Sequence, residues 1–374
     1  MKKVLAALLC LSLLLCTACS ADVPQVTDPI ETTEAAKAAE LIFTDDLITE
    51  LDEAVKSNKY EGIIYLTHKG EPVYQFVSGT NDLGEPLSVD SPMYMCSTSK
   101  QFCATSVLML RDQGKLSLDD TLEKYFPEYT IGKDITLKQM LSMRSGIIRD
   151  MEPMWQTPEL YENNTPEENE AAFKEWIFAK PLNFTPGSQM EYCNVNYVLL
   201  SLIVEMVSGE NYEDFVRQNI YEPVGMTHSG FITEVKENPQ WGLTYDNIQA
   251  TGQVHLIAQG AGGIVTTAAD MTLFMSALQS GRLISMESLR EMTTDHSPED
   301  VISNYGYAMM GVRGGWGHGG NNGTYASQVY FNEEYDLNLF MATSSMTVYR
   351  MDMQDNTFNA LLRTIFAAVD AASK

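Results

Sequence analysis

Histidine and cysteine are scarce in this chain, and their scarcity limits the metal chemistry that it can support. The 374 residues include five histidines and six cysteines, and three of those cysteines lie within the first 19 residues. The other three, Cys96, Cys103 and Cys193, have spacings typical of neither a disulfide framework nor a zinc site. We therefore expect no metal centre and no disulfide, and we interpret these three thiols as packing residues.

Basic residues are also few relative to acidic ones. The chain has 24 lysines and arginines against 50 aspartates and glutamates, which gives a formal charge of −26. A surface this negative repels phosphate backbones, which argues against a nucleic-acid partner. The sequence contains no Gly-x-Ser-x-Gly, the nucleophile turn of the α/β-hydrolases, so that class is disfavoured. What remains is an ordinary globular composition, with 44% hydrophobic residues.

A long apolar run lies near the N-terminus. Two lysines precede the run from Val4 to Leu15, and small residues lead from it through Ala18 to Cys19. This order is that of a secretion signal, and the run is too short to span a bilayer as a stable helix. Because the small residues before Cys19 resemble a bacterial lipoprotein signal, we expect residues 1–19 to be such a signal peptide and Cys19 to be lipidated. The protein would then be exported to the cell envelope and held at the outer face of the membrane by its lipid alone. Cleavage near Ala18 with free secretion is the alternative.

Composition divides the rest of the chain into a linker and one domain. Residues 20–43 are rich in Thr, Glu, Ala, Asp and Pro, which is typical of a flexible acidic tether. Thr44 has the character of a helix N-cap, because apolar residues follow it at helical spacing. We therefore expect the domain to occupy residues 44–374.

Segments with strand character lie at both ends of this domain, and helical segments lie between them. Long apolar helices are expected from Ser97 to Gln113 and from Asn194 to Val207. The expected strands are 62–67, 72–77, 305–312, 325–331 and 337–343, and further helices are expected at 268–278 and 356–372. The economical arrangement is an α+β fold, in which one antiparallel sheet is formed from both termini, with flanking helices and an inserted helical lobe.

Ser97 and Lys100 form the first candidate catalytic pair, at the start of the buried helix. A helix N-terminus favours developing negative charge near Ser97, and Lys100 lies one turn further along the same face. Burial among apolar residues removes the hydration of the Lys100 ammonium, which lowers its pKa and lets it act as a base. Ser-x-x-Lys is the arrangement found in β-lactamases and penicillin-binding proteins, although two fixed residues of common types also occur together by chance.

Tyr-x-Asn is the second element that such a site needs, because a phenol relays protons and an amide binds substrate. The pattern occurs four times, at Tyr161, Tyr192, Tyr245 and Tyr330. Only the copy from Tyr192 to Asn194 follows a Pro-Gly turn and precedes a long apolar helix. A site residue needs that kind of anchored loop next to rigid structure. We therefore predict that Tyr192 and Asn194 belong to the site and that the other copies are surface or packing residues.

The third element is Lys or His, any residue, and then Gly, on a strand beside the cleft. It has three candidates, which begin at His68, His228 and His318. Only His318-Gly319-Gly320 comes after the other two motifs and leads into a segment with clear strand character. The glycines around it allow a backbone to approach a ligand closely. We interpret His68 as a hairpin residue and His228 as a loop residue.

These motifs in this order resemble the serine β-lactamase-like superfamily, in the branch with class C β-lactamases, D-Ala-D-Ala carboxypeptidases of the B type and related esterases. The similarity covers about residues 45–372. It implies a β-lactamase/transpeptidase-like fold with no metal and no organic cofactor. Four further stretches are similar to the family, namely Gly114–Asp120, Leu141–Gly146, Pro223–Thr227 and Gly262–Thr267.

The resemblance also implies a role for each site residue. Ser97 would attack a carbonyl to form an acyl-enzyme, and Lys100 and Tyr192 would handle its proton. Backbone N–H groups of Ser97 and Asn321 would form the oxyanion hole, although the glycine after Asn321 is displaced from the commonest family pattern. Asn194 would bind Lys100 as well as substrate, and the set expected to bind substrate is Asn194, His318, Gly320 and Asn321.

The expected function is hydrolysis of peptides, amides or esters, with D-alanyl peptides of the cell wall as the leading substrates and peptidoglycan as a candidate partner. Class C β-lactamases have lysine where this chain has His318, and an ordinary histidine is mostly neutral at pH 7.5. We therefore predict poor β-lactam turnover, and we expect His318→Lys to improve affinity for carboxylate-bearing β-lactams, chiefly above pH 7. The alternatives are a class C-like β-lactamase and a surface receptor that binds penicillin or muropeptides without turnover.

Overall fold

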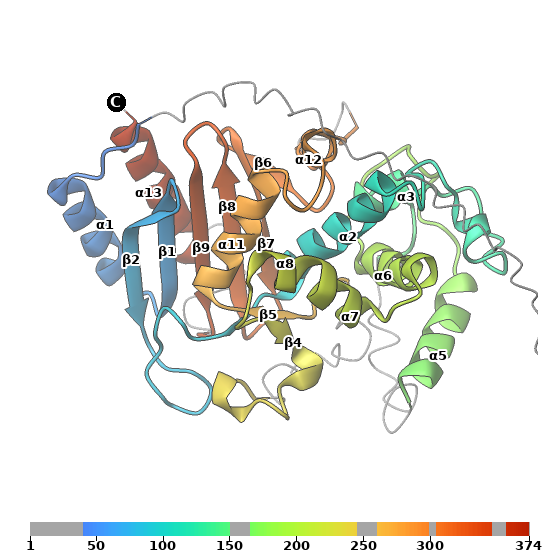
Figure 1. Ribbon diagram of the computed structural model, residues 1–374, viewed down its shortest axis with the longest axis horizontal. Helices are drawn as coiled ribbons and strands as arrows, with labels where there is room; N and C mark the ends of the chain where they lie inside the picture. Colours follow the sequence, from blue (N-terminus) through green and yellow to red (C-terminus); the bar gives the residue numbers. More distant parts are fainter. Residues whose placement is uncertain (1–39, 150–164, 245–259, 299–303, 346–356, 374) are drawn as a thin grey trace, which may run out of the picture. The chain divides into compact units, whose positions relative to one another are not determined.

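A six-stranded antiparallel sheet forms the centre of the domain (Figure 1). The computed structural model describes residues 40–149, 165–244, 260–298, 304–345 and 357–373. The strand order is β2-β1-β9-β8-β7-β6, so the two N-terminal strands pair with the C-terminal ones through β1 and β9. The strands are β1 (Gly62–His68), β2 (Glu71–Ser78), β6 (Met310–Val312), β7 (Gly315–Asn321), β8 (Ala326–Asn332) and β9 (Leu337–Thr343).

Both faces of this sheet are covered, which explains why β1 and β9 are buried along nearly their whole length. Helices α1 (Asp45–Ser57) and α13 (Thr357–Ala372) lie together on one face, and α11 (Ala268–Gln279) lies against β1 and β9 on the other (Figure 1). Adjacent side chains in β1 enter different cores: Ile64 packs with α1 and α13, and Ile63 packs with the larger core. This is the period of two that a strand buried on both faces requires.

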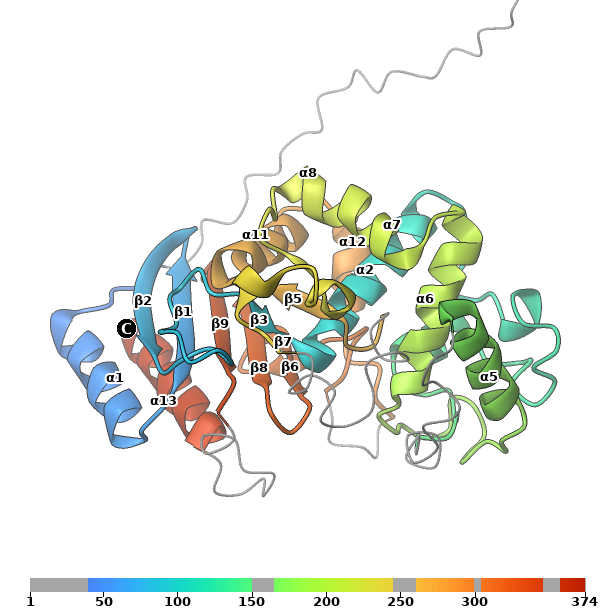
Figure 2. The ribbon, with the colours of Figure 1, turned by 90° about the horizontal axis from the view of Figure 1, so that it is seen from below.

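A helical lobe and a small second sheet complete the domain, and the lobe lies on the side of the large sheet away from α1 and α13 (Figure 2). The second sheet has the order β3-β5-β4, with β3 at Met93–Tyr94, β4 at Gly230–Phe231 and β5 at Ile264–Thr266. The other helices are α2 (Lys100–Asp112), α3 (Leu137–Leu141), α5 (Pro166–Phe178), α6 (Asn194–Ser208), α7 (Tyr212–Val216), α8 (Glu222–Val224) and α12 (Met286–Met292), and short helical turns are η1 (Cys96–Ser99), η2 (Leu122–Lys124), η4 (Arg217–Tyr221), η5 (Ile232–Glu234) and η6 (Pro239–Trp241).

The expected architecture is confirmed, and Thr44 caps α1 by accepting a hydrogen bond from the Leu47 backbone N–H. Two strand predictions are wrong. The strand expected at 305–312 is only Met310–Val312, because Ala308 has a left-handed backbone (φ 54°) that interrupts an extended chain. Strand β7 was missing from the strands expected from residue pattern, because glycine is depleted in strands, and only the third motif indicated a strand at His318. Three of its glycines are required by close packing, since a Cβ on Gly315, Gly317 or Gly320 would collide with a neighbouring carbonyl oxygen.

The N-terminal end of the domain begins slightly before Thr44. Leu41 is buried, and the backbone N–H of Ile42 donates to the carbonyl oxygen of Ala372 at 3.0 Å, at the end of α13. The expected signal peptide and all but the last four residues of the expected tether lie outside the described residues. Within the ranges that are described, no helix has the length and apolar character needed to cross a membrane.

Candidate active site

The nucleophile candidate stands on a strained turn in front of helix α2. Ser97 is the second residue of η1, and its side chain is partly exposed while Cys96, Thr98 and Ser99 are buried. Cys96 has a left-handed backbone (φ 49°), a conformation that a residue with a Cβ adopts only when its surroundings enforce it. The Thr98 hydroxyl donates to the carbonyl oxygen of His318 at 3.2 Å, which ties this turn to strand β7. The fold therefore presents Ser97 alone to the solvent side of the turn.

Lys100, the first residue of α2, is completely buried and directed at Ser97. Its Nζ lies 3.0 Å from the Ser97 Oγ and donates to the carbonyl oxygen of Ala261 at 2.6 Å. The rings of Tyr192 and Tyr197 face the ammonium group, 5.1 and 5.8 Å away. Burial lowers the pKa of Lys100 to about 7, so a large share of the side chain is an uncharged amine near neutral pH. The predicted base is thus within reach of the predicted nucleophile.

Tyr192 and Asn194 lie at the start of α6 and bring two unsatisfied polar groups to the site. Burial raises the pKa of Tyr192, and the interaction of its phenol with the Ser97 hydroxyl lowers that pKa by a smaller amount. The Tyr192 hydroxyl and the Asn194 side-chain oxygen are buried, and neither has a hydrogen-bond partner of normal geometry among the described residues. The expected contact from Asn194 to Lys100 is therefore absent among the described residues, and the Lys100 Nζ donates to the carbonyl oxygen of Ala261 instead.

The loop that carries Tyr192 rests on residues 143–146. Three backbone hydrogen bonds join the two segments. The N–H of Glu191 donates to the carbonyl oxygen of Met143 (3.0 Å), that of Gly187 to Arg144 (2.8 Å) and that of Asn183 to Gly146 (2.7 Å). Met143 makes this possible with a left-handed backbone (φ 61°), and Ser145 donates to the Asn196 side chain of α6 at 2.7 Å. The stretch Leu141–Gly146 therefore fixes the position of Tyr192 without touching Ser97.

His318 lies inside β7 and is almost fully buried, at 1% exposure. Its Nδ1 lies 2.6 Å from the Gly319 carbonyl oxygen, an acceptor, so Nδ1 carries the proton and Nε2 accepts from the Tyr305 hydroxyl at 3.2 Å. Burial and the charge of Lys100 lower the pKa of His318 to about 3. The expectation that His318 titrates near neutral pH is therefore wrong. Tyr305 was not expected in the site, and no sequence signal marks it, since an irregular turn and strand β6 separate it from β7.

Strand β7 passes directly beside the nucleophile. Strand β6 pairs only with Gly315, Trp316 and Gly317, so residues 318–321 lie beyond that pairing. A Cβ on Gly320 would lie 2.8 Å from the Ser97 backbone nitrogen and inside contact distance of the Met95 carbonyl oxygen, so only glycine fits there. Asn321, the last residue of β7, is exposed, and its side-chain oxygen accepts from the Gly323 backbone N–H at 2.6 Å.

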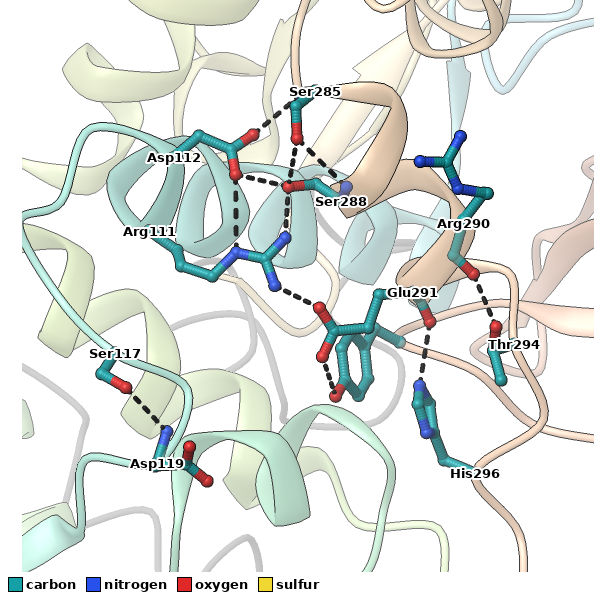
Figure 3. Close-up of polar contacts among 11 residues, drawn as sticks. Arg111, Asp112, Ser117, Asp119, Ser285, Ser288, Arg290, Glu291, Thr294 and His296 are labelled. Carbon is teal, nitrogen blue, oxygen red and sulfur yellow. Dashed lines mark hydrogen bonds and ion pairs between the residues drawn. The ribbon is translucent and has the colours of Figure 1, made fainter.

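A polar network holds α12 against α2 and supports the segment that leads to Tyr305 (Figure 3). The Arg111 guanidinium binds Ser288 and Glu291, and Glu291 accepts from the Tyr307 hydroxyl at 3.0 Å. His296 stacks on the Tyr307 ring at 4.3 Å, and its backbone N–H donates to the Tyr305 carbonyl oxygen at 2.8 Å. The C-terminal end of α2 and Tyr305, the hydrogen-bond partner of His318, are therefore held in place by one connected set of contacts.

The remaining motif candidates lie elsewhere. His68 ends β1 at the β1–β2 hairpin, His228 lies in the turn before β4, and Tyr330 lies within β8. Tyr161 and Tyr245 lie outside the described residues. In the described part of the chain, no group of three or more His, Cys, Asp or Glu side chains is placed to hold a metal ion. Cys96, Cys103 and Cys193 are free and buried, as packing residues would be.

Comparison with known proteins agrees with this geometry. The beta-lactamase family model matches residues 45–364. A chain of Bacillus subtilis (strain 168) that carries a penicillin-binding protein name, PbpX, is 30% identical over 294 residues, which are 76% of this chain and 71% of that one. A chain of Escherichia coli (strain K12) that carries the name of a D-alanyl-D-alanine carboxypeptidase is 25% identical over 307 residues, 72% of this chain and 67% of that one.

Solved structures show the same fold. The D-amino acid amidase from Ochrobactrum anthropi SV3, in complex with L-phenylalanine, superposes with a TM-score of 0.71 at 23% identity and covers 88% of this chain and 99% of its own. A penicillin-binding protein from Bacillus halodurans gives a TM-score of 0.68 at 19% identity, with 85% and 99% covered. The expected fold and the expected class, a serine hydrolase, are confirmed: the chain belongs to the beta-lactamase family.

Proposed function

We propose that this protein hydrolyses D-alanyl peptides and related D-amino acid amides through an acyl-enzyme on Ser97. The observation that carries the proposal is the 3.0 Å contact between the buried Lys100 amine and the hydroxyl of Ser97. Ser97 is partly exposed, whereas the other residues of its turn are buried. A nucleophile and a base within hydrogen-bond reach are the minimum for covalent acyl transfer. The names of the Escherichia coli relative and of the Ochrobactrum amidase support the substrate class.

The pKa values divide the proton chemistry between two residues. Lys100, with its pKa of about 7, accepts the Ser97 proton as the hydroxyl attacks the carbonyl. Burial raises the pKa of Tyr192, so its phenol stays protonated at neutral pH and donates to the leaving nitrogen. The Lys100 ammonium then returns the proton to Tyr192. Water attacks the acyl-enzyme in the second half of the reaction, and the same groups act in reverse order.

The oxyanion of the tetrahedral intermediate would be held by backbone N–H groups of Ser97 and Asn321. Support for this assignment comes from Gly320, whose Cα lies against the Ser97 backbone nitrogen and so brings the end of β7 beside the nucleophile. The Asn194 side-chain oxygen, which lacks a partner among the described residues, would accept the N–H of the substrate amide. Neutral His318, with its two nitrogens engaged, would shape this wall of the cleft rather than transfer a proton.

A substrate panel tests the proposed function. Purified protein is assayed with D-alanyl-D-alanine peptides, D-phenylalanine amide, simple esters and penicillin, and acylation is followed by mass spectrometry. We expect turnover of the D-amino acid substrates and a transient acyl group on Ser97. Faster turnover of penicillin than of the peptides would instead identify a class C-like β-lactamase. A lasting acyl group with no turnover of any substrate would identify a penicillin or muropeptide receptor.

His318→Lys should increase acylation by penicillin by about tenfold, because an ammonium group in place of the uncharged imidazole gains a charge-assisted hydrogen bond to the carboxylate. Since the pKa of His318 is about 3, the wild-type imidazole is uncharged throughout the range from pH 6 to 8. The gain should therefore appear across that range, and not chiefly above pH 7. His318→Gln, which stays neutral, is the matched control and should show no gain. Equal gains in both variants would contradict the role of charge.

We further propose that residues 1–19 are a lipoprotein-type signal, that residues 20–43 are a tether and that Cys19 carries the lipid at the outer face of the membrane. In a bacterial host, the full-length chain should then fractionate with membranes, and Cys19→Ser should release it or block its processing. One acyl chain binds a membrane only marginally, so more than one chain is needed for stable anchoring. A wild-type chain found entirely in the soluble fraction would support free secretion after cleavage near Ala18.

A further inference from the structure

Neither His318 nor Lys100, the two basic residues that the described part of the chain places at the centre of the site, is free to bind a substrate carboxylate. His318 is uncharged, and its two ring nitrogens contact the Gly319 carbonyl oxygen and the Tyr305 hydroxyl. The Lys100 Nζ is buried between Ser97 and the carbonyl oxygen of Ala261. A peptide that ends in a D-amino acid nevertheless carries a carboxylate, and the chain as a whole is strongly negative. Attraction of an anionic substrate therefore needs a positive charge elsewhere at the cleft.

Arg149 supplies such a charge on the Tyr192 side of the site. The residue before it, Ile148, is fixed there, because its carbonyl oxygen accepts a hydrogen bond from the Cys193 thiol at 3.5 Å. Ile148 and Tyr192 also pack against the same hydrophobic core. The Arg149 side chain is exposed, and its charge acts on the Tyr192 phenol, since it lowers the pKa of Tyr192 against the larger effect of burial. The contact of Ile148 with Cys193 thus places the backbone before Arg149 beside the loop that carries Tyr192, and the Arg149 side chain is in contact with solvent.

Within the described ranges, Arg111 and Arg144 have partners and Arg149 has none. Arg111 forms an ion pair with Glu291, and Arg144 donates to the backbone carbonyl oxygens of Gly187 and His296. Arg149 makes no hydrogen bond or ion pair with any residue in the described ranges. Nearby, the Tyr192 hydroxyl and the Asn194 side-chain oxygen are buried without partners in those ranges, which marks the adjacent space as one that a polar ligand completes.

We propose that Arg149 is a specificity-determining residue that binds a carboxylate of the substrate, so that this enzyme prefers anionic peptides and amides to neutral ones. A guanidinium suits this role because its planar donors match the two oxygens of a carboxylate. The proposal rests on the proposed function and narrows its substrate class. The carboxylate can belong to the leaving group or to the acyl part of the substrate, and both positions present the same chemical group to Arg149.

The experiment compares matched substrate pairs that differ by one carboxylate. The first pair is N-acetyl-D-alanyl-D-alanine and its C-terminal amide, and the second is N-succinyl-D-alanine p-nitroanilide and its N-acetyl counterpart. Wild-type protein should prefer the anionic member of one pair, and that pair identifies where the carboxylate lies. Arg149→Gln should raise KM for this anionic member by about 10- to 100-fold and leave the neutral member unchanged. Arg149→Lys should retain part of the preference, because it keeps the charge but not the paired donors.

Arg282→Gln is the matched control, since Arg282 is exposed in the turn after α11 and its loss changes the net charge equally. It should leave every preference unchanged. If wild-type protein turns over both members of each pair equally, or if Arg149→Gln keeps the preference, the role of Arg149 is overturned and the proposed function stands. If no member of either pair is hydrolysed or acylates Ser97, the proposed function fails, and this proposal fails with it.

Discussion

Ser97→Ala should abolish hydrolysis and covalent labelling by a fluorescent penicillin or fluorophosphonate, with a loss of at least about a thousandfold in kcat. Alanine removes the attacking oxygen, and no other hydroxyl lies within hydrogen-bond distance of the Lys100 amine among the described residues. The fold should be unaffected, because Ser97 is partly exposed and Lys100 keeps its bond to the Ala261 carbonyl oxygen. Label incorporation and the thermal midpoint, measured on the same preparation, check both expectations.

Ser99→Ala is the matched control for this experiment, since Ser99 belongs to the same turn. Its hydroxyl is buried and accepts a hydrogen bond from the Ile264 backbone N–H at 2.9 Å. Removal of that acceptor should destabilise the fold by about 1–3 kcal/mol, because a buried donor is left unpaired. Labelling of the folded variant should persist. The assignment of the nucleophile would be overturned by the reverse pattern, in which Ser97→Ala is labelled and Ser99→Ala is not.

Lys100→Met should lower kcat/KM by about 100- to 10,000-fold, the usual contribution of a positioned general base. In the wild-type protein, kcat/KM should rise with pH and level off above a pKa of about 7, as Lys100 loses its proton. Lys100→Met should lose this rise, because the titrating base is absent. Ionisation of Tyr192 should not cause a similar rise in kcat/KM, since burial raises the pKa of Tyr192 and keeps its phenol protonated over this range. Initial rates from pH 5.5 to 9 check the profile.

Lys100→Met should also increase the free energy of unfolding, and the size of this increase should depend on pH. The folded-state pKa of Lys100, about 7, lies below its ordinary value of 10.5. The unfolded chain therefore binds more protons between these two values, so wild-type stability rises with pH across that interval. Lys100→Met removes the burial penalty, so its advantage of roughly a few kcal/mol should be largest below pH 7 and fade toward pH 10.5. An advantage that does not change with pH would show that Lys100 titrates normally.

Predictions made from the sequence were most accurate where the helix signals of a segment and the burial of its side chains indicate the same structure. The helix after Ser97 lacks glycine and proline until Gly114, and its apolar residues place it in the core. The depressed pKa of Lys100 follows from that burial alone. The adjoining turn and helix were the grounds for choosing Tyr192 among four copies, and the order of the motifs was the ground for choosing His318 among three. In each case the residue is positioned by its own helix, strand or adjoining loop.

Predictions failed where contacts between distant segments decide the structure. Nothing near Lys100 in the sequence indicates the Ala261 carbonyl oxygen, which takes the place expected for Asn194. The glycine-rich β7 lacks the branched side chains that mark a strand, because neighbouring backbones occupy the space where side chains would lie. The pKa of His318 could not be predicted either, since it depends on burial by the opposite wall of the site and on the nearby Lys100.

The pairing of β1 with β9 fixes the order in which this protein can assemble. Ile63 pairs with Ala342, and the Tyr60 hydroxyl donates to the Ala342 carbonyl oxygen at 2.8 Å across 282 positions of the chain. Neither contact can form on the ribosome before Ala342 has been synthesised. Such long-range pairing folds slowly and leaves intermediates with an unpaired strand edge. Until β9 has been synthesised, the β9-facing edge of β1 therefore stays unpaired and can pair with another strand edge or bind a chaperone.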